Sequence, residues 1–334
     1  MALVLLLSAC GSAAPVSTPA ASGQAAGAAS AKLPQMVDIK VSQTAEGTSS
    51  WPLRIAVAKG FFKDEGLNVE LINIASSANQ TQALLNGDVQ FNIYTIDSIA
   101  KAVVAGADLK FIGSAQDTPN LAIYAGPGIN TWADFKGKTL AAGSPNGFFD
   151  IMLRAALKAN GLNRGDYTVL SIPNDAARVP AIKVGTIQGA LVSTGSASDV
   201  LARQDGLKKM GDITDYVKDV QYNGYTMATK WGQAHESTVV AYLRALRKSA
   251  AWIYDPANKE ALKKVVADPA GSDAAFWDDL YDLMTKQKML SPNVQPNMKG
   301  IQNLMDLAVQ LGAMDKTPPL DTWVDLTYLD QASK

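Results

Sequence analysis

Strand-like and helix-like stretches alternate along most of this chain, and this order limits its fold more than any other feature. Alternating or continuous apolar runs predict strands at residues 37–41, 67–72, 91–94, 109–113, 138–142, 167–172 and 188–193. Helical spacing of apolar residues predicts helices between them, at residues 53–62, 78–85, 96–104, 148–160, 176–184 and 197–204. Strands separated by helices are typical of βαβ units, so we expect an α/β fold with mostly parallel sheets flanked by helices.

The alternation is interrupted at Gly126-Pro127-Gly128 and then restarts. A later strand-like stretch, residues 222–229, leads into a tail, 237–311, whose pattern is almost wholly helical. We therefore predict two lobes joined by two hinge crossovers, the first lobe formed by residues 33–126 and 220–334 and the second by residues 127–219. Ligands bind beyond the carboxyl ends of strands in such open sheets, and a cleft between two lobes allows hinge closure.

The N-terminal residues differ in composition from the rest of the chain. An apolar run at residues 2–7 is followed by Ser8, Ala9 and Cys10, the only cysteine in the sequence. This pattern predicts an export signal over residues 1–10. It resembles the lipobox of bacterial lipoproteins, which implies that Cys10 carries lipid. Residues 11–32, nearly all Ala, Gly, Ser, Pro and Thr, predict a flexible tether. The alternative is that Cys10 is a buried structural residue.

Charge and rare residues exclude several functions. The 334 residues include 30 Lys and Arg and 31 Asp and Glu, with no basic stripe, which argues against nucleic acid as a partner. The sequence has a single cysteine, so it cannot form an internal disulfide. It also has a single histidine, His235, and therefore few of the side chains from which metal sites and catalytic triads are usually built. We therefore expect no catalytic residue, cofactor or metal. No later segment approaches the roughly 20 apolar residues that span a bilayer, so we expect an extracytoplasmic protein anchored to the membrane by lipid alone.

Five segments together carry a resemblance to a known family. They are residues 60–70, 84–91, 134–140, 143–147 and 181–190, which read GFFKDEGLNVE, LLNGDVQF, DFKGKTL, GSPNG and AIKVGTIQGA. In this order they resemble the periplasmic solute-binding proteins of ABC importers, in the branch that includes sulfonate, taurine, nitrate and thiamine-precursor binders. The resemblance covers about residues 37–268.

This resemblance implies a type II-like periplasmic-binding-protein fold and a receptor rather than an enzyme. Such a receptor captures a small organic molecule, anionic or aromatic, and delivers it to a membrane permease and its ATPase; we expect a monomer. Many relatives have aspartate where Gln90 and Gln188 stand, and proline where this chain has Thr194-Gly195-Ser196. The second departure lies at the expected cleft, so the ligand is not carried over from any relative.

Candidate ligand-binding residues of the first lobe follow predicted strands. Hydroxyls and backbone N–H groups at a helix start can bind an anion or a carbonyl group. The alternatives are ordinary packing for the tryptophan and helix capping for the serines and the aspartate. The candidates are Trp51, Ser76, Ser77, Thr95, Asp97 and Gln116.

Candidates of the second lobe occupy the equivalent junctions. The glycine-rich loop at residues 143–147 opens a helix but lacks the Gly-Lys-Ser/Thr ending of a nucleotide-binding loop. Arg178 either forms a surface ion pair with Asp175 or points into the cleft, where its planar fork suits a carboxylate or sulfonate. The candidates are Ser144, Asn146, Phe148, Asn174, Arg178, Ser193 and Thr194.

Two other functions remain open at this point. The same fold resembles menaquinone-pathway enzymes and thiamine pyrimidine synthases. The latter resemblance implies a cysteine-rich motif and an active-site histidine, whereas the expected folded body has no cysteine and only His235. The third function is a receptor that signals to a sensor partner without transport.

Overall fold

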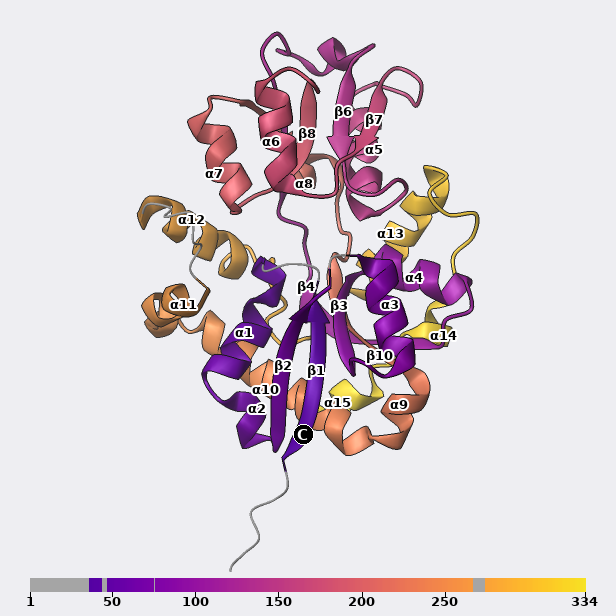
Figure 1. Ribbon diagram of the computed structural model, residues 1–334, viewed down its shortest axis with the longest axis vertical. Coiled ribbons are helices and arrows are strands. Elements are labelled where there is room, and N and C mark those ends of the chain that lie inside the picture. Colours follow the sequence, from indigo (N-terminus) through magenta and orange to yellow (C-terminus); the bar gives the residue numbers. More distant parts are fainter. Residues whose placement is uncertain (1–35, 44–46, 75, 267–273) are drawn as a thin grey trace, which may run out of the picture. The chain divides into compact units, whose positions relative to one another are not determined.

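Two five-stranded sheets organise the protein, and Figure 1 shows them in the computed structural model, which describes residues 36–43, 47–74, 76–266 and 274–334. The first sheet has the order β2-β1-β3-β10-β4, and the second has the order β7-β6-β8-β5-β9. The strands of the first are β1 (Val37–Gln43), β2 (Leu67–Asn73), β3 (Phe91–Thr95), β4 (Leu109–Gln116) and β10 (Asn223–Ala228). Those of the second are β5 (Leu121–Ala125), β6 (Thr139–Ala142), β7 (Thr168–Ser171), β8 (Gly189–Ser193) and β9 (Lys208–Asp212).

Helices follow most strands and flank both sheets. In the part of the chain before β10 they are η1 (Thr48–Ser50), α1 (Trp51–Ala58), α2 (Phe61–Asp64), α3 (Ser77–Asn86), α4 (Ile96–Val104), η2 (Trp132–Phe135), α5 (Phe148–Ala159), α6 (Asp175–Lys183), α7 (Ala197–Gln204) and α8 (Ile213–Tyr216). After β10 come α9 (Thr229–Ala234), α10 (Glu236–Tyr254), η3 (Pro256–Asn258), α11 (Lys259–Val266), α12 (Ala274–Thr285), α13 (Met298–Gln310), α14 (Leu320–Trp323) and α15 (Thr327–Ala332). The predicted export signal, Cys10 and the tether lie outside the described residues.

Each sheet is mixed, because one of its five strands is reversed. In the first sheet β1 is parallel to β2 and β3, whereas β10 is antiparallel to β3 and β4. In the second, β6 is parallel to β7 and β8, whereas β5 is antiparallel to β8 and β9. The prediction of an α/β fold with mostly parallel sheets is confirmed. Both reversed strands directly follow a crossover between the sheets, and this is why they run against their neighbours.

The first crossover lies earlier than the sequence pattern placed it. The predicted boundary at residue 126 put residues 121–125 in the first lobe, but β5 pairs with β8, with Leu121 opposite Ser193. The crossover is therefore the short segment 117–120 between β4 and β5. Strand β5 is entirely buried, so its sequence is a plain apolar run that does not reveal which sheet it joins. Below, the first lobe means the first sheet with its helices, and the second lobe means the second sheet with α5–α8.

Side-chain alternation along β1 explains how the first sheet is covered on both faces. Val41 belongs to a buried cluster with α1 and α10, in which Phe91 stacks on Tyr242 with ring centroids 3.9 Å apart. The next residue, Ser42, donates instead to Gln80 of α3 at 3.3 Å. Helices α1 and α10 therefore cover one face and α3 the other.

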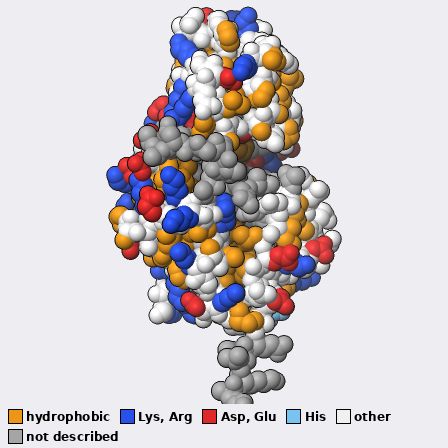
Figure 2. Space-filling view, turned by 60° about the vertical axis from the view of Figure 1, so that its left-hand side comes forward, with side chains coloured by type: hydrophobic (Ala, Val, Ile, Leu, Met, Phe, Trp, Pro, Cys, Tyr) orange, Lys and Arg blue, Asp and Glu red, His pale blue; other side chains and the backbone are white. Residues whose placement is uncertain are grey.

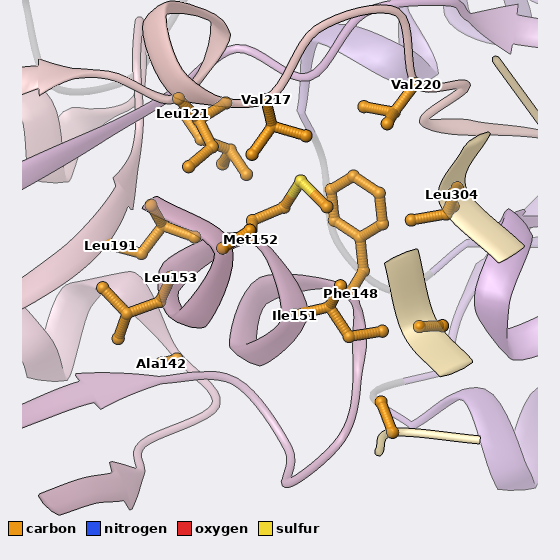
Figure 3. Close-up of a cluster of buried hydrophobic side chains, with 14 of the residues drawn as sticks. Leu121, Ala142, Phe148, Ile151, Met152, Leu153, Leu191, Val217, Val220 and Leu304 are labelled. Atoms are coloured by element: carbon orange, nitrogen blue, oxygen red, sulfur yellow. The ribbon is translucent and has the colours of Figure 1, made fainter. Parts of the chain in front are cut away.

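A second buried cluster fixes α5 in the second lobe (Figure 3). Met152 and Leu153 of α5 lie beside Leu121 and Leu191 of the second sheet. At the start of α5, Phe148 belongs to the same cluster as Leu304 of α13. The first turn of α5 directly follows the glycine-rich loop, and apolar side chains from both lobes pack against it.

Surface charge agrees with the balanced composition. On the face drawn in Figure 2, acidic and basic side chains both occur among apolar and uncharged ones. Among the helices that the structure describes, none is long and apolar enough to cross a bilayer.

Candidate functional site

A pocket with a cavity volume of about 160 Å³ lies where the two lobes face each other. From the first lobe, the pocket is lined by the ends of β1 and β3, the start of β10, residues of η1, and the first turns of α3 and α4. The second lobe contributes the glycine-rich loop and the first turn of α5. The pocket therefore lies at the carboxyl ends of parallel strands, where this kind of sheet binds ligands.

Four helices begin at the pocket. Ser50 precedes α1, Ser77 is the first residue of α3, Thr95 precedes α4 and Gly147 precedes α5, and all four residues line the cavity. The first backbone N–H groups of a helix have no partner inside it, and the helix dipole is positive at that end. The starts of α3, α4 and α5 can therefore donate hydrogen bonds to acceptor atoms of a ligand, whereas at α1 Trp51 N already donates to Thr48 O and Pro52 has no N–H.

Hydroxyl groups of α3 and α4 form one cluster beside these helix starts. Thr95 Oγ1 and Ser98 Oγ are 3.0 Å apart, and Ser98 Oγ lies 3.4 Å from Ser77 Oγ. Tyr94 donates its hydroxyl proton to Thr81 at 2.9 Å, and burial raises the pKa of Tyr94, so its phenol stays protonated. This side of the pocket can donate or accept, because hydroxyl protons rotate.

Two buried amide side chains complete the wall from the first lobe. Gln43 ends β1 and Asn223 begins β10, and each is 4% exposed. Gln43 Nε2 donates to Asn73 Oδ1 at 3.0 Å. Within the described residues, Gln43 Oε1 and Asn223 Oδ1 have no hydrogen-bond partner. Both residues line the pocket, so a ligand donor that reaches either oxygen would satisfy it.

Two phenylalanines of α5 form the wall from the second lobe. Phe148 packs on Tyr222 with ring centroids 4.8 Å apart, and Phe149 lies with its ring 5.2 Å from the Arg178 guanidinium carbon. A side chain at Gly143 would meet Phe149 Cβ at 3.3 Å, so the small residue lets the loop approach this ring.

Polar contacts join the glycine-rich loop to both lobes, and we call them the interlobe clamp (Asp97, Lys101, Asn146, Asp150 and Arg154). Lys101 of α4 pairs with Asp97 at 2.9 Å and donates to the Asn146 carbonyl oxygen. Arg154 of α5 pairs with Asp150 at 3.0 Å and donates to Leu311 O, beyond α13, at 2.7 Å. The clamp holds the pocket loop of one lobe against helices of the other.

Arg178 does not face the pocket. It is fully buried and donates from Nε to Ile172 O, from Nη1 to Asp175 and Leu191 O, and from Nη2 to Pro173 O, at 2.6–2.9 Å. Burial lowers the pKa of this guanidinium, and Asp175 opposes the shift. The sequence left a choice between a surface ion pair and a ligand contact; in the structure Arg178 does pair with Asp175, but the guanidinium is buried and ties α6 to the second sheet.

The remaining sequence candidates divide between the pocket and other places. Four of them line the cavity: Ser77, Thr95, Ser144 and Phe148. Trp51 packs instead against Trp277 with ring centroids 5.4 Å apart, and Gln116 accepts from Thr48 at 2.9 Å in the buried crossover region. Ser76 and Asn174 cap α3 and α6, and Asp97 and Asn146 belong to the interlobe clamp. Ser193 and Thr194 bond through their backbones to Asp175 and Asn120.

Sequence reasoning missed several lining residues. Gln43 is a polar residue directly after a predicted strand, a signal that could have identified it. Ser98 lies one helical turn after Thr95, so it shares the same helix face. Asn223 had no usable signal, because β10 comes from a distant part of the chain and its start is buried beside β3.

A half-buried carboxyl group, that of Asp117, lies in the first crossover. Asp117 Oδ1 accepts from Ser114 Oγ at 2.5 Å and from Gln221 Nε2, in the second crossover, at 3.3 Å. Burial raises the pKa of Asp117 to about 6, and hydrogen bonds from Ser114, Gln221 and Ser291 oppose part of this shift. Tyr222 N donates to Asp117 O at 2.9 Å, so the two crossovers are directly bonded.

Two mixed sheets joined by paired crossovers, with a pocket between them, define the periplasmic-binding-protein fold. The chain belongs to the NMT1/THI5 like family, whose profile matches residues 48–259, more than half of the chain. It is 21% identical over 302 residues to YtlA of Bacillus subtilis, which is provisionally named as a binding protein; the match covers 87% of this chain and 88% of YtlA.

Two further proteins are similar to this chain. The nitrate-binding protein NrtA of Synechocystis PCC 6803 has a similar fold, with a TM-score of 0.71 at 17% identity, covering 90% of this chain and 89% of NrtA. A 4-amino-5-hydroxymethyl-2-methylpyrimidine phosphate synthase of Schizosaccharomyces pombe is 28% identical over 142 residues, which is 42% of this chain and 40% of the enzyme. Proteins similar to this chain are thus named both as binding proteins and as an enzyme. Within the described residues no group of three or more His, Cys, Asp or Glu side chains could hold a metal ion.

Proposed function

We propose that this protein is the extracytoplasmic solute-binding component of an ABC importer. It captures a small organic molecule in the pocket between its lobes and delivers it to a membrane permease and its ATPase. The observation that carries the proposal is the pocket itself, because one ligand there contacts helix starts from both lobes. Binding energy can thus favour the closed arrangement, which the permease recognises.

The polar wall favours ligands with acceptor groups, and Phe148 and Phe149 favour a flat or apolar part. The likeness to YtlA and NrtA supports a binding role, since both are named as binding proteins. We further propose that the receptor is a monomer held at the membrane by lipid on Cys10. Such a tether keeps it at high local concentration near its permease.

The function is tested by ligand screening followed by transport. Purified protein is screened by thermal shift against sulfonates, aromatic carboxylates, nitrate, pyrimidines and their uncharged analogues. A ligand at 100 times its Kd adds about 2.7 kcal/mol to the free energy of unfolding. A deletion strain is then expected to lose uptake of the same compound. Normal uptake in that strain would rule out the transport role.

The enzyme alternative has a specific basis in the similarity to the pyrimidine phosphate synthase. A receptor returns its ligand unchanged, whereas an enzyme releases a product. Mass spectrometry of the ligand after prolonged incubation separates the two, and a new product would favour the enzyme.

The anchor is tested independently of the ligand. Cells grown with labelled fatty acid are expected to label the wild-type protein and not a Cys10→Ser variant. Label on the variant would show that the lipid is attached elsewhere.

A further inference from the structure

The two unpartnered amide oxygens restrict the chemistry of the ligand. Gln43 Oε1 and Asn223 Oδ1 are buried, belong to residues that line the pocket, and find no partner among the described residues. A ligand N–H group that reaches either oxygen gives it the hydrogen bond that it lacks, which raises the affinity about tenfold. The favoured ligand therefore brings hydrogen-bond donors to these oxygens.

The arrangement of the strands places the two acceptors on either side of one strand end. Gln43 is the last residue of β1, Asn223 is the first of β10, and β3 lies between these strands. Strands are about 4.8 Å apart, so the two backbones are separated by roughly 10 Å. The Gln43 amide is oriented by its donation to Asn73 at 3.0 Å, which leaves Oε1 as the atom without a partner.

Charge is the second restriction. None of the described side chains that line the pocket is charged. The neighbouring cations are occupied: Lys101 bonds Asp97 and the Asn146 carbonyl, and Arg178 bonds four oxygen atoms of its own lobe. Among the described residues an oxyanion would find helix N–H groups but no cation lining the pocket, and it would have no proton to donate to Gln43 or Asn223.

We propose that the pocket selects an uncharged small molecule that carries N–H donors beside a carbonyl or sulfonyl oxygen, an amide-type group, over the corresponding oxyanion. The ligand oxygen accepts from the helix starts, and the ligand N–H groups donate to Gln43 and Asn223. This inference rests on the proposed solute-binding function and names its ligand class. It differs from the nitrate named for NrtA.

Matched pairs of probes test the proposal on the full-length wild-type protein. Benzamide is compared with benzoate, benzenesulfonamide with benzenesulfonate, and acetamide with acetate, by titration at millimolar concentrations and pH 7.5. Each pair has nearly the same shape and differs in charge and in N–H donors. We expect the uncharged member of at least one pair to bind tenfold or more tightly than the anion.

Variants at Gln43 test whether its side-chain oxygen causes the preference for the uncharged member of each probe pair. Gln43→Met keeps the length of the side chain but removes the oxygen, and it is expected to lower the ratio of amide to carboxylate affinity about tenfold. Gln43→Glu keeps an acceptor and is expected to retain the preference. Gln90→Met is the matched control, because the Gln90 side chain bonds Lys40 N and Gly87 O away from the pocket. Thermal melting of each variant confirms that it is folded.

Three results would overturn the inference: equal or tighter binding of the anion in every pair, absence of binding by every uncharged probe, or an unchanged preference in Gln43→Met. If Gln43→Met does not fold, the comparison of each probe pair on the wild-type protein still tests the inference. A protein that binds a sulfonate and whose deletion abolishes sulfonate uptake keeps the proposed transport function but loses this ligand class. Uptake that survives the deletion removes the transport function instead.

Discussion

The rims of the two sheets, where their parallel strands end and helices begin, are built from the same kind of strand-to-helix junction, yet they use their polar side chains differently. On the first-lobe rim, the described residues give no partner to Gln43 Oε1 or Asn223 Oδ1. On the second-lobe rim, Asp175 accepts from Arg178 and from Ser193 N, and Arg178 donates to three carbonyl oxygens. The same kind of junction therefore leaves side-chain acceptors unpartnered in the first lobe and uses its polar side chains to tie α6 to the sheet in the second.

The largest expected effect tests the second-lobe rim. Arg178→Met removes the hydrogen bonds that Arg178 donates to Asp175 Oδ1 and to three carbonyl oxygens, so we expect the free energy of unfolding to fall by about 3–5 kcal/mol. Urea denaturation measures the change. Lys183→Met is the matched control in the same helix, because the 60% exposed Lys183 pairs with Asp205 at the surface. Its expected loss is below about 1 kcal/mol. Equal losses in the two variants would contradict the structural role of Arg178.

The next largest change in stability is expected at Asp117, in the first crossover between the two sheets. The folded-state pKa of Asp117, about 6, is above its ordinary value of 3.8, so its ionised form destabilises the fold. Asp117→Asn is expected to be more stable than wild type by about 2–3 kcal/mol above pH 7. Its advantage should shrink as pH falls from about 6 to about 4, where the wild-type carboxyl becomes protonated. A pH-independent difference between the two proteins would exclude this titration.

The interlobe clamp, which holds one rim against the other, is tested by hydrogen exchange. Asp97→Asn with Lys101→Met removes the bond to the Asn146 carbonyl without leaving a buried charge unpaired. We expect amide exchange in residues 143–147 to become about tenfold faster, which corresponds to about 1.4 kcal/mol. Asp97→Asn alone keeps Lys101 and should leave the exchange unchanged. Unaltered exchange in the double variant would show that the clamp does not hold the loop.

Two adjacent serines give the smallest effect and the finest comparison. Ser76 caps α3 by accepting from Asn79 N at 3.2 Å, whereas Ser77 lines the pocket. Ser76→Ala is expected to lower the free energy of unfolding by about 1 kcal/mol and to leave Kd unchanged. Ser77→Ala is expected to raise Kd for the bound solute about three- to tenfold without changing stability. If Ser76→Ala changed Kd and Ser77→Ala changed stability instead, the roles of the two serines would be reversed.

The order of strands and helices could be predicted because each is a local pattern of apolar residues. The exceptions were β5, a buried run with no period, and β9, whose edge position requires little apolar sequence. The site was less accessible to sequence. Ser77 and Thr95 were found because helix starts have local signals. Arg178 could not be assigned because one of its acceptors, Leu191 O, lies on another strand, and Gln116 because its partner Thr48 is 68 residues away.

The bond between Tyr222 N and Asp117 O has a consequence for how such proteins diversify. It joins the residue where the chain leaves the first sheet to the one where it returns, so the second lobe is a continuous insertion that begins and ends at one point. A segment with adjacent ends can be exchanged as a cassette without rerouting the host chain. Transplanting residues 117–222 between relatives would replace Phe148 and Phe149 while keeping Gln43 and Asn223. The apolar wall of the pocket can therefore change in evolution while its polar acceptors stay the same.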